Sequence, residues 1–353
     1  RGYGIEGIQI DGNNILEVYD TIKGVREYCI ENQKPYLIEC MTFRMRGHEE
    51  ASGVKYVPPA LFDLWEKKDP IKNYEQYLLQ QNILTEQAVA DIRNEIKEYI
   101  EAELKTGYQS EPIFPNTAEE VNDLYAPSLK KAPINDAGLE GVDKRFIDGI
   151  KEGLHQSMQQ HPNLVLMGQD IAEYGGAFKI TEGFVGTFGK ARVRNTPICE
   201  SAIVGAALGL SLKGYKAMME MQFADFATVG FNQIVNNLAK IHYRWGQNAD
   251  VVIRMPTGGG VGAGPFHSQS NEAWFVHTPG LKIVYPSTPA DAKGLLIAAI
   301  NDPNPVLYFE HKALYRSISG PVPEGYYEVE IGKARIIQQG EDITIITYGA
   351  GVH

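Results

Sequence analysis

Residues 144–311 alternate short apolar runs with helical patterns, and this alternation is the strongest constraint on the fold. The apolar runs are the strand candidates "LVLMGQDI", "RVRNTPI", "KAMMEMQF", "ADVVIRMP", "KIVYP" and "VLYFEH". The segments between them carry helix patterns, as in "FIDGIKEGLHQSMQQH", "SAIVGAALGLSL", "FATVGFNQIVNNLAKIHYRW" and "PADAKGLLIAAI". Since strands that alternate with helices of this length pair in parallel, we predict a doubly wound parallel α/β sheet over residues 143–325. Thr288 is the expected N-cap of the last helix, with Pro289 at its first position.

A second α/β pattern opens the chain. Strand "IEGIQI", helix "ILEVYDTIKGVREYCIEN" and strand "PYLIECMTF" predict a βαβ unit, which the polar loop "RMRGHEEASGVKYVPPA" follows. The helix "TEQAVADIRNEIKEYIEAELK" carries one apolar stripe. Residues 106–142 combine scattered prolines with no sustained period, so they read as a linker. We therefore expect two doubly wound α/β domains, the first of them partial and covering residues 1–105.

The two ends of the sequence raise a separate expectation. The final residues "DITIITYGAGVH" read as a strand and its turn, and residues 326–353 are expected to begin a further domain. Neither end has the pattern of a natural terminus, so we expect the sequence to be an internal portion of a longer protein.

Composition excludes several classes of protein. The net charge of -11 comes without a clustered basic face, which argues against nucleic acid as a partner. No run of eighteen apolar residues and no secretion signal is present, so we expect no membrane span. The three cysteines, Cys29, Cys40 and Cys199, lack metal-ligand spacing and favour a reducing, cytoplasmic setting.

Glu200 is the first candidate for chemistry, because ligands of parallel sheets bind beyond the carboxyl ends of the strands. It follows "NTPIC" and opens a helix that is almost entirely apolar. One interpretation is an acidic residue that complements the helix dipole. The other is a carboxyl group used in general acid–base catalysis, which the apolar surroundings favour.

Two further strand ends carry candidates. Gln222, Phe223 and Phe226 follow one strand, either as core residues or as a platform for a cofactor. His267 follows the glycine-rich stretch "MPTGGGVGAGP", whose spacing fits neither the dinucleotide fingerprint nor a P-loop. A histidine framed by glycines and hydroxyl groups is a candidate for a catalytic or ligand-binding role.

The first domain offers two ambiguous features. The stretch "IQIDGNN" is either a compressed magnesium site or a turn, and we favour a turn in which Asn13 or Asn14 caps the following helix. Asp11 and Gly12 then turn the chain. His48 lies in the polar loop, beside Arg44, Arg46 and the acidic pair Glu49 and Glu50, and is either a solvated loop residue or a functional one. The G-x-S-x-G motif of nucleophilic hydrolases is absent.

These segments together resemble a known family. The runs "RVRNTPICESAIVGAALGLSLKGYKAMMEMQFADF", "FNQIVNNLAKIHYRWG", "FHSQSNEAWFVHTPGLKIVYPSTPADAKGLL" and "LYR" closely resemble the beta part of the thiamine-diphosphate-dependent 2-oxo acid dehydrogenases. "GYGIEGIQIDGNN" and "MTFRMRGHEEAS" resemble the carboxyl-terminal half of the alpha part. The resemblance implies a fused alpha–beta decarboxylating component. Its expected reaction is oxidative decarboxylation of a 2-oxo acid, with the acyl group passed to lipoyl-lysine of an acyltransferase partner.

The resemblance also assigns roles to residues. It implies that Glu200 binds a ring nitrogen of the cofactor's aminopyrimidine and that Ile198, Gln222 and Phe226 contact the same ring. His267 falls on the beta histidine that handles protons during decarboxylation and acyl transfer. His48 falls on the alpha histidine near the diphosphate and the substrate channel, so both histidines are expected to be catalytic.

Metal ions are expected at two places. The family's G-D-G to N-N motif, which binds Mg²⁺ and the diphosphate, is expected upstream of Arg1. A structural monovalent cation, such as K⁺, is implied at Val252, Ala299, Asp302 and Asn304.

The sequence departs from the family pattern at three positions. Glu49 replaces the serine that follows the loop histidine, so regulation by phosphorylation of that serine is not expected. Phe266 replaces a common Gln, and Gln169 replaces a common Glu. The segments "NTPICE", "QFADF" and "FHSQS" resemble branched-chain members, so we expect 3-methyl-2-oxobutanoate as the preferred substrate. The family resemblance also implies a homodimer of the fused chain. A pyruvate-type component, a transketolase-like or synthase relative, and a non-catalytic fragment stay open as alternatives.

Overall fold

The computed structural model describes residues 2–49, 51–128 and 140–353. It divides into two compact units, Arg1–Ile113 and Phe114–His353, which are considered one at a time. Glu50 and residues 129–139 of the predicted linker lie outside the described residues. No helix in the part of the chain described is long and apolar enough to cross a membrane.

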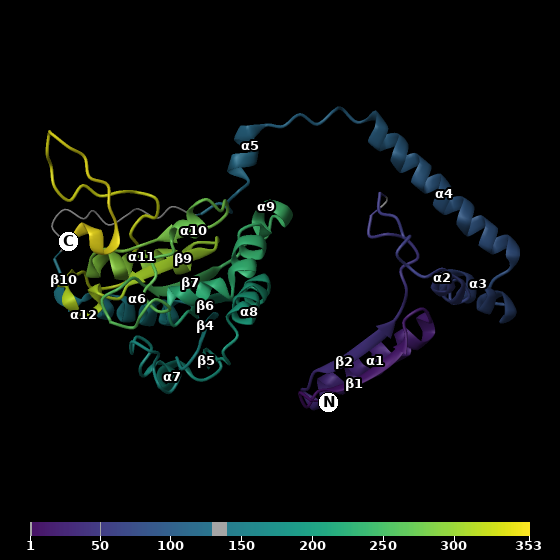
Figure 1. The fold of residues 1–353 in the computed structure, drawn as a ribbon, viewed down its shortest axis with the longest axis horizontal. Coiled ribbons are helices and arrows are strands. Elements are labelled where there is room, and N and C mark those ends of the chain that lie inside the picture. Colours follow the sequence, from purple (N-terminus) through teal and green to yellow (C-terminus); the bar gives the residue numbers. More distant parts are fainter. Residues whose placement is uncertain (1, 50, 129–139) are drawn as a thin grey trace. The chain divides into compact units, whose positions relative to one another are not determined.

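The first unit begins with the predicted βαβ arrangement (Figure 1). Strands β1 (Glu6–Asp11) and β2 (Tyr36–Met41) pair in parallel, and helix α1 (Ile15–Asn32) connects them. Asn14 caps α1, because its Oδ1 accepts hydrogen bonds from the backbone of the first turn. Asp11 Oδ1 accepts the backbone N–H of Asn13 at 3.0 Å. The interpretation of "IQIDGNN" as a capped turn is therefore confirmed.

Three further helices complete the first unit: α2 (Pro59–Glu66), α3 (Pro70–Gln80) and α4 (Glu86–Gln109). Thr85 Oγ1 caps α4 by accepting the N–H of Ala88 at 3.2 Å. The helix continues four residues into the segment that the sequence pattern assigned to the linker. Its apolar stripe is exposed within this unit, since Ile96 and Leu104 retain 54% and 53% of their accessible surface.

The second unit contains the predicted parallel sheet. Its six strands lie in the order β5-β4-β6-β7-β9-β8, and all their pairings are parallel. The strands are β4 (Leu164–Gly168), β5 (Val193–Asn195), β6 (Lys216–Glu220), β7 (Val251–Thr257), β8 (Lys282–Val284) and β9 (Val306–His311). A separate antiparallel pair joins β3 (Val142–Arg145) to β10 (Ser319–Val322).

Helices of the second unit precede, connect and follow these strands (Figure 1). The helices are α5 (Thr117–Asn122), α6 (Phe146–Gln160), α7 (Phe184–Phe188), α8 (Glu200–Leu212), α9 (Ile241–Trp245), α10 (Ala273–Val276), α11 (Pro289–Asn301) and α12 (Leu314–Ser317).

The sheet has a buried core on each face, as a doubly wound fold requires. Met218 of β6 and Tyr308 of β9 pack in the core that contains α6 and α11. The next residues along the same strands, Met219 and Phe309, pack in the opposite core with α8. Side chains alternate between the two cores because successive residues of a strand point to opposite faces.

One predicted helix is wrong. The pattern of residues 226–245 predicts a single α-helix, but the structure has three shorter pieces. These are a 3₁₀-helix, η1 (Ala224–Thr228), a π-helix, η2 (Gln233–Leu238), and α9. Asp225 lies in η1, and its Oδ1 accepts a hydrogen bond from the N–H of Gln269, in the loop after β7. Gly230 packs closely against Val204 of α8. These contacts override the local helical period.

A second correction concerns the last residues. The alternation in 342–348 predicts a strand, but these residues form none, and the described chain ends in a short 3₁₀ turn, η3 (Gly349–Val352). Ile343, Ile345 and Ile346 are largely exposed, and no described strand pairs with them. A strand requires a hydrogen-bonded neighbour, which the alternating pattern alone does not supply.

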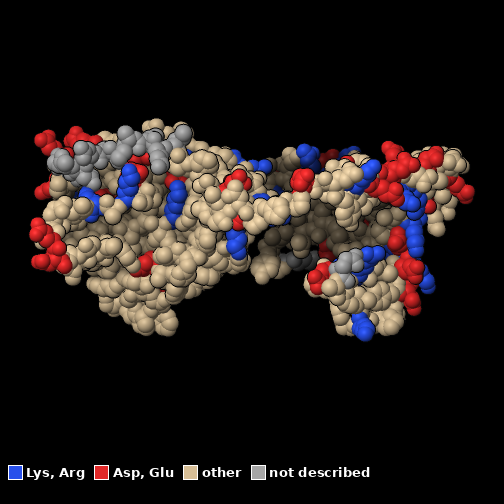
Figure 2. Space-filling view, turned by 90° about the horizontal axis from the view of Figure 1, so that it is seen from above, with Lys and Arg blue, Asp and Glu red and all other residues tan. Residues whose placement is uncertain are grey.

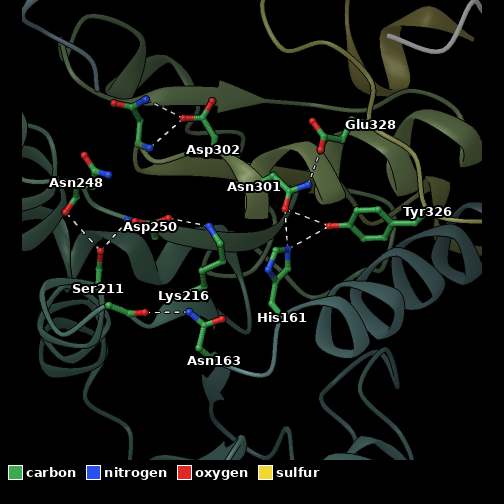
Figure 3. A network of polar contacts seen from close by, with 12 residues as sticks. His161, Asn163, Ser211, Lys216, Asn248, Asp250, Asn301, Asp302, Tyr326 and Glu328 are labelled. Carbon is green, nitrogen blue, oxygen red and sulfur yellow. Dashed lines mark hydrogen bonds and ion pairs between the residues drawn. The ribbon is translucent and has the colours of Figure 1, made fainter. Parts of the chain in front are cut away.

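Polar contacts tie the amino-terminal edge of the sheet together (Figure 3). Lys216 Nζ donates to Asp250 Oδ1 at 2.7 Å, which joins the start of β6 to the residue before β7. Ser211 Oγ accepts the N–H of Asp250 at 2.8 Å. His161 Nε2 lies 2.7 Å from Asn301 Oδ1, linking the ends of α6 and α11. Basic and acidic side chains are interspersed on the face shown in Figure 2.

The cap of α11 gives a test of this packing. Thr288 Oγ1 accepts the N–H of Asp291 at 3.2 Å, and Pro289 occupies the first turn, as predicted. Thr288→Ala is expected to lower the free energy of unfolding by about 1 kcal/mol, because an N–H loses its acceptor. Urea denaturation followed by circular dichroism measures the change. Thr187→Ala is the control, since this exposed hydroxyl only donates to the carbonyl of Gly183, the residue before α7. An equal loss in both variants would contradict the capping role.

Candidate active site

The candidate residues of the second unit follow the carboxyl ends of neighbouring strands. Gln169 follows β4, Gln222 follows β6, and His267 lies in the loop after β7. Because β4, β6 and β7 are neighbours in the sheet, their carboxyl ends meet at one edge. The sheet topology therefore gathers segments that are far apart in sequence.

Glu200 is buried at the start of α8. It retains only 6% of its surface, and the residues that follow it in the helix, such as Ile203 and Val204, lie in the apolar core. Gln169 Nε2 donates a hydrogen bond to Glu200 Oε1 at 3.1 Å. No described residue forms a hydrogen bond to the other carboxylate oxygen, Oε2.

Gln169 is a site residue that the sequence showed only as a departure from the family pattern. Its amide holds one oxygen of Glu200 and places no second negative charge beside it. A signal for this pairing was present, because the two residues follow consecutive predicted strands, and the structure shows that these strands are neighbours. The contact itself joins positions 31 residues apart, which no local pattern reveals.

His267 lies against two phenylalanine rings. Its ring centroid is 4.8 Å from that of Phe223 and 5.5 Å from that of Phe226, and both contacts are edge-to-face. All three side chains are partly buried. Gln222 is also partly buried, whereas Ile198 is 84% exposed within this unit. The structure thus brings His267 and Phe226 together and leaves Ile198 on the surface.

The loop that carries His267, residues 258–271, is called the His267 loop. Gly258 begins it at φ 77°, and a Cβ there would lie 2.5 Å from His311 Nε2, so glycine is required. Gln269 is the main anchor: Asp225 Oδ1 accepts its N–H at 3.2 Å, and Thr257 Oγ1 donates to its carbonyl at 2.9 Å. Sequence reasoning missed the anchoring role of Asp225.

His48 lies in the other unit. Its side chain is exposed, and Nδ1 lies 2.9 Å from Ser52 Oγ, which also donates to Glu49 Oε1 at 3.3 Å. The structure places His48 in the unit Arg1–Ile113 and the other candidates in the unit Phe114–His353.

The residues proposed for a monovalent cation are buried and already have protein partners. Asp302 caps the end of α11, where its Oδ2 accepts from Lys282 Nζ at 2.6 Å and its Oδ1 accepts from Asn304 Nδ2 at 2.8 Å. Asn304 also bonds to the backbone of Ala126. Val252 lies in β7 and Ala299 in α11, and both side chains belong to the same apolar core. The ammonium group of Lys282 supplies the positive charge beside Asp302. The monovalent-cation site at these residues stays a prediction.

A buried network of ion pairs joins strands β6, β7 and β9 within the sheet. Arg254 of β7 is fully buried and donates to Glu220 Oε2 at 2.6 Å and to Glu310 Oε1 at 2.6 Å. Tyr315 O–H also donates to Glu310. Burial raises the pKa of Glu220, and Arg254 opposes this rise. The network therefore links three neighbouring strands of the sheet.

Comparisons with known proteins agree with this arrangement. Residues 144–317 match the family model "Transketolase, pyrimidine binding domain", and residues 1–113 match "Dehydrogenase E1 component". Across the described parts of the chain, no group of three or more His, Cys, Asp or Glu side chains is gathered to hold a metal ion.

Individual relatives come from two kinds of dehydrogenase. The chain is 48% identical over 210 residues to 2-oxoisovalerate dehydrogenase subunit beta of Bacillus subtilis, which covers 59% of this chain and 64% of the relative. It is 46% identical over 227 residues to the mitochondrial 2-oxoisovalerate dehydrogenase subunit beta of Dictyostelium discoideum, covering 64% and 60%. It is 44% identical over 210 residues to pyruvate dehydrogenase E1 component subunit beta of Bacillus subtilis, covering 59% and 65%.

The matched region spans less than two thirds of the length of each of these relatives. The chain therefore combines a first region similar to dehydrogenase E1 components with a second region similar to the pyrimidine-binding domain of transketolases, and it is related to the beta subunits of 2-oxoisovalerate and pyruvate dehydrogenases.

Proposed function

We propose that the chain is part of a fused alpha–beta decarboxylating component of a 2-oxo acid dehydrogenase that uses thiamine diphosphate. Two family matches on one chain support the fusion, since the E1-type region precedes the pyrimidine-binding region. The observation that carries the proposal is Glu200, a buried carboxylate at the carboxyl edge of the sheet, with one oxygen held by Gln169 and the other without a hydrogen bond from any described residue.

The residues at this edge suit the aminopyrimidine of the cofactor. Glu200 Oε2 would exchange a proton with a ring nitrogen, while Gln169 keeps the carboxylate in place. Phe226 would present an aromatic face and Gln222 an amide to the same ring. When bound, thiamine diphosphate supplies the electron sink that decarboxylation requires.

The histidines and metal ions take the remaining roles in this proposal. His267, oriented by the rings of Phe223 and Phe226, would move protons near the 2-oxo acid, and His48 would lie near the diphosphate. The Mg²⁺ that accompanies the diphosphate would be held by a G-D-G to N-N motif, which residues 1–353 do not contain. K⁺ at Asp302 and Asn304 remains a proposal, and any such ion would share the site with Lys282.

The whole protein would act on a branched-chain 2-oxo acid. Identity to the 2-oxoisovalerate relative of Bacillus subtilis, at 48%, exceeds identity to the pyruvate relative of the same organism, at 44%, and this difference supports 3-methyl-2-oxobutanoate over pyruvate. The acyl group would pass to a lipoylated acyltransferase in a multienzyme complex. We further propose a homodimer of the fused chain and a cytoplasmic location.

Calorimetric titration and an activity assay test this proposal. Thiamine diphosphate with Mg²⁺ is expected to release or absorb heat on binding to the purified chain, and dye reduction is expected to be more efficient with 3-methyl-2-oxobutanoate than with pyruvate. No heat at millimolar cofactor would contradict cofactor binding and favour a non-catalytic fragment. Equal or better efficiency with pyruvate would overturn the substrate preference. Ligation of two 2-oxo acids without dye reduction would indicate a synthase instead.

A further inference from the structure

Lys312 is a buried cation that the proposed chemistry does not use. It is the first residue after β9 and retains only 3% of its surface. Its Nζ is buried without a hydrogen-bond partner among the described residues and lies 5.3 Å from the ring centroid of Phe223. The same ring contacts His267, so Phe223 has the ammonium group and the histidine as neighbours.

Asp225 is a second buried side chain, and it contacts the His267 loop. Its Oδ1 accepts the N–H of Gln269 from the His267 loop, whereas its Oδ2 is buried and has no partner in the described chain. The residue is 5% exposed. Burial lowers the pKa of Lys312, and the charge of Asp225 acts in the opposite direction. Backbone contacts connect the two residues: the N–H of Lys312 donates to the carbonyl of Thr257 at 3.0 Å, and Thr257 Oγ1 and Asp225 Oδ1 both bond to Gln269. No direct ion pair joins them among the described residues.

Buried charges without hydrogen bonds are strongly unfavourable, and native proteins satisfy such groups with protein atoms or with ordered water. Asn271 adds a third buried atom of this kind: its Nδ2 donates to Ala224 O at 2.8 Å, but its Oδ1 has no described partner. A buried water can accept a hydrogen bond from an ammonium group and donate hydrogen bonds to carboxylate and amide oxygens.

We propose that a buried water joins Lys312 Nζ to Asp225 Oδ2, and that this solvent-mediated ion pair positions the His267 loop against η1. Asp225 is the link, because its other oxygen already holds the loop at Gln269. Lys312 is then a positioning residue, which keeps the side chain of Asp225 turned toward the loop. The inference rests on the proposed function only for the role of His267; the ion pair and the anchoring of the loop stand apart from it.

A crystal structure of the unmodified chain is the first test. At a resolution that shows ordered water, one water is expected within hydrogen-bond distance of both Lys312 Nζ and Asp225 Oδ2. A Lys312 side chain that points away from Asp225, or a dry gap between the two groups, would overturn the proposal without any variant.

Hydrogen–deuterium exchange of the His267 loop is the second test. Lys312→Met and Asp225→Asn are each expected to raise amide exchange in this loop by about tenfold, the effect of leaving one buried charge without its partner. The double variant is expected to exchange more slowly than either single variant, since no unpaired charge remains. Additive increases in the double variant would contradict the coupling.

The pair Lys216 and Asp250 provides a matched control. It joins the same residue types at the opposite edge of the same sheet (Figure 3). Lys216→Met is expected to lower the melting temperature and leave exchange in the His267 loop unchanged. Equal exchange in this variant and in Lys312→Met would reduce the role of Lys312 to general stability.

Activity adds a measurement that separates this inference from the proposed function. In the assembled enzyme, Lys312→Met is expected to lower kcat and leave KM for the 2-oxo acid nearly unchanged, because the variant displaces a proton-handling loop rather than a binding pocket. Loss of loop protection with no decarboxylation in any form of the protein would contradict the proposed function alone. Full loop protection in both single variants would contradict the ion pair alone.

Discussion

Glu200→Gln is expected to lower the rate of 2-oxo acid decarboxylation by about 10²- to 10⁴-fold, the usual contribution of a positioned acid–base group. The glutamine retains an oxygen that can accept the hydrogen bond from Gln169, so the fold of α8 should persist. It cannot exchange a proton as the carboxylate does. Dye reduction with 3-methyl-2-oxobutanoate measures the rate, and circular dichroism confirms that the variant is folded.

Glu173→Gln is the matched control for this experiment. Glu173 also follows β4, but it is exposed and bonds to Lys190 and Asn195. Its substitution is expected to leave the rate unchanged. A Glu200→Gln protein that decarboxylates as fast as the unmodified one would contradict the catalytic role of Glu200 and would leave it as a partner of the helix dipole.

Arg254→Met is expected to have the largest effect on stability. The arginine is fully buried between Glu220 and Glu310, which retain 4% and 0% of their surface. Its removal leaves two buried carboxyl groups without a counter-charge and is expected to lower the free energy of unfolding by about 3–5 kcal/mol. Urea denaturation measures this loss. Arg145→Met, at an exposed pair with Asp148, is expected to change stability much less.

The loss in Arg254→Met should also depend on pH. The pKa of Glu220 is raised in the folded chain because burial outweighs the attraction of Arg254. A raised carboxyl pKa contributes stability that is complete below the unfolded pKa and is lost as pH rises through the folded pKa. Without Arg254, nothing opposes the effect of burial on the pKa of Glu220, so more stability is lost as the pH rises. The variant should therefore be less stable at about pH 8 than at about pH 5.

Replacing all three charges tests the same network from the other side. Arg254→Met combined with Glu220→Gln and Glu310→Gln removes every formal charge and is expected to recover part of the lost stability. A triple variant that is less stable than Arg254→Met would show that the carboxylates are satisfied without the arginine.

The parallel sheet was predictable because the central strands, such as β4 and β9, are largely apolar runs between helical patterns, which is typical of strands buried on both faces. Val306–His311 was predicted to the residue. Residues 226–245 were not, because the π-helix Gln233–Leu238 and the inward turn of Asp225 depend on contacts with α8 and with the His267 loop. The helical spacing of apolar residues in this segment does not reveal such contacts.

The position of the candidate site was predictable from the sequence, but its contacts were predictable only in part. Strand order places Glu200 and His267 at the carboxyl edge, as the sequence indicated. The hydrogen bond from Gln169 to Glu200 and the burial of Lys312 arise from chain segments brought together by the sheet. Polar residues such as Asp225 look like ordinary turn residues in sequence, so their burial appears only in three dimensions.

The place of β9 in the sheet has a consequence for how the second unit forms. β9 lies between β7 and β8, although it follows both along the chain. β8 pairs with no other described strand, so it stays unpaired until β9 inserts beside it. A parallel pair cannot start from a tight hairpin, and every pairing must wait for an intervening crossover. Without β9, therefore, β8 has no partner among the described strands and one side of β7 has no neighbour, so an unpaired β9 would leave β7 open to pairing with another chain.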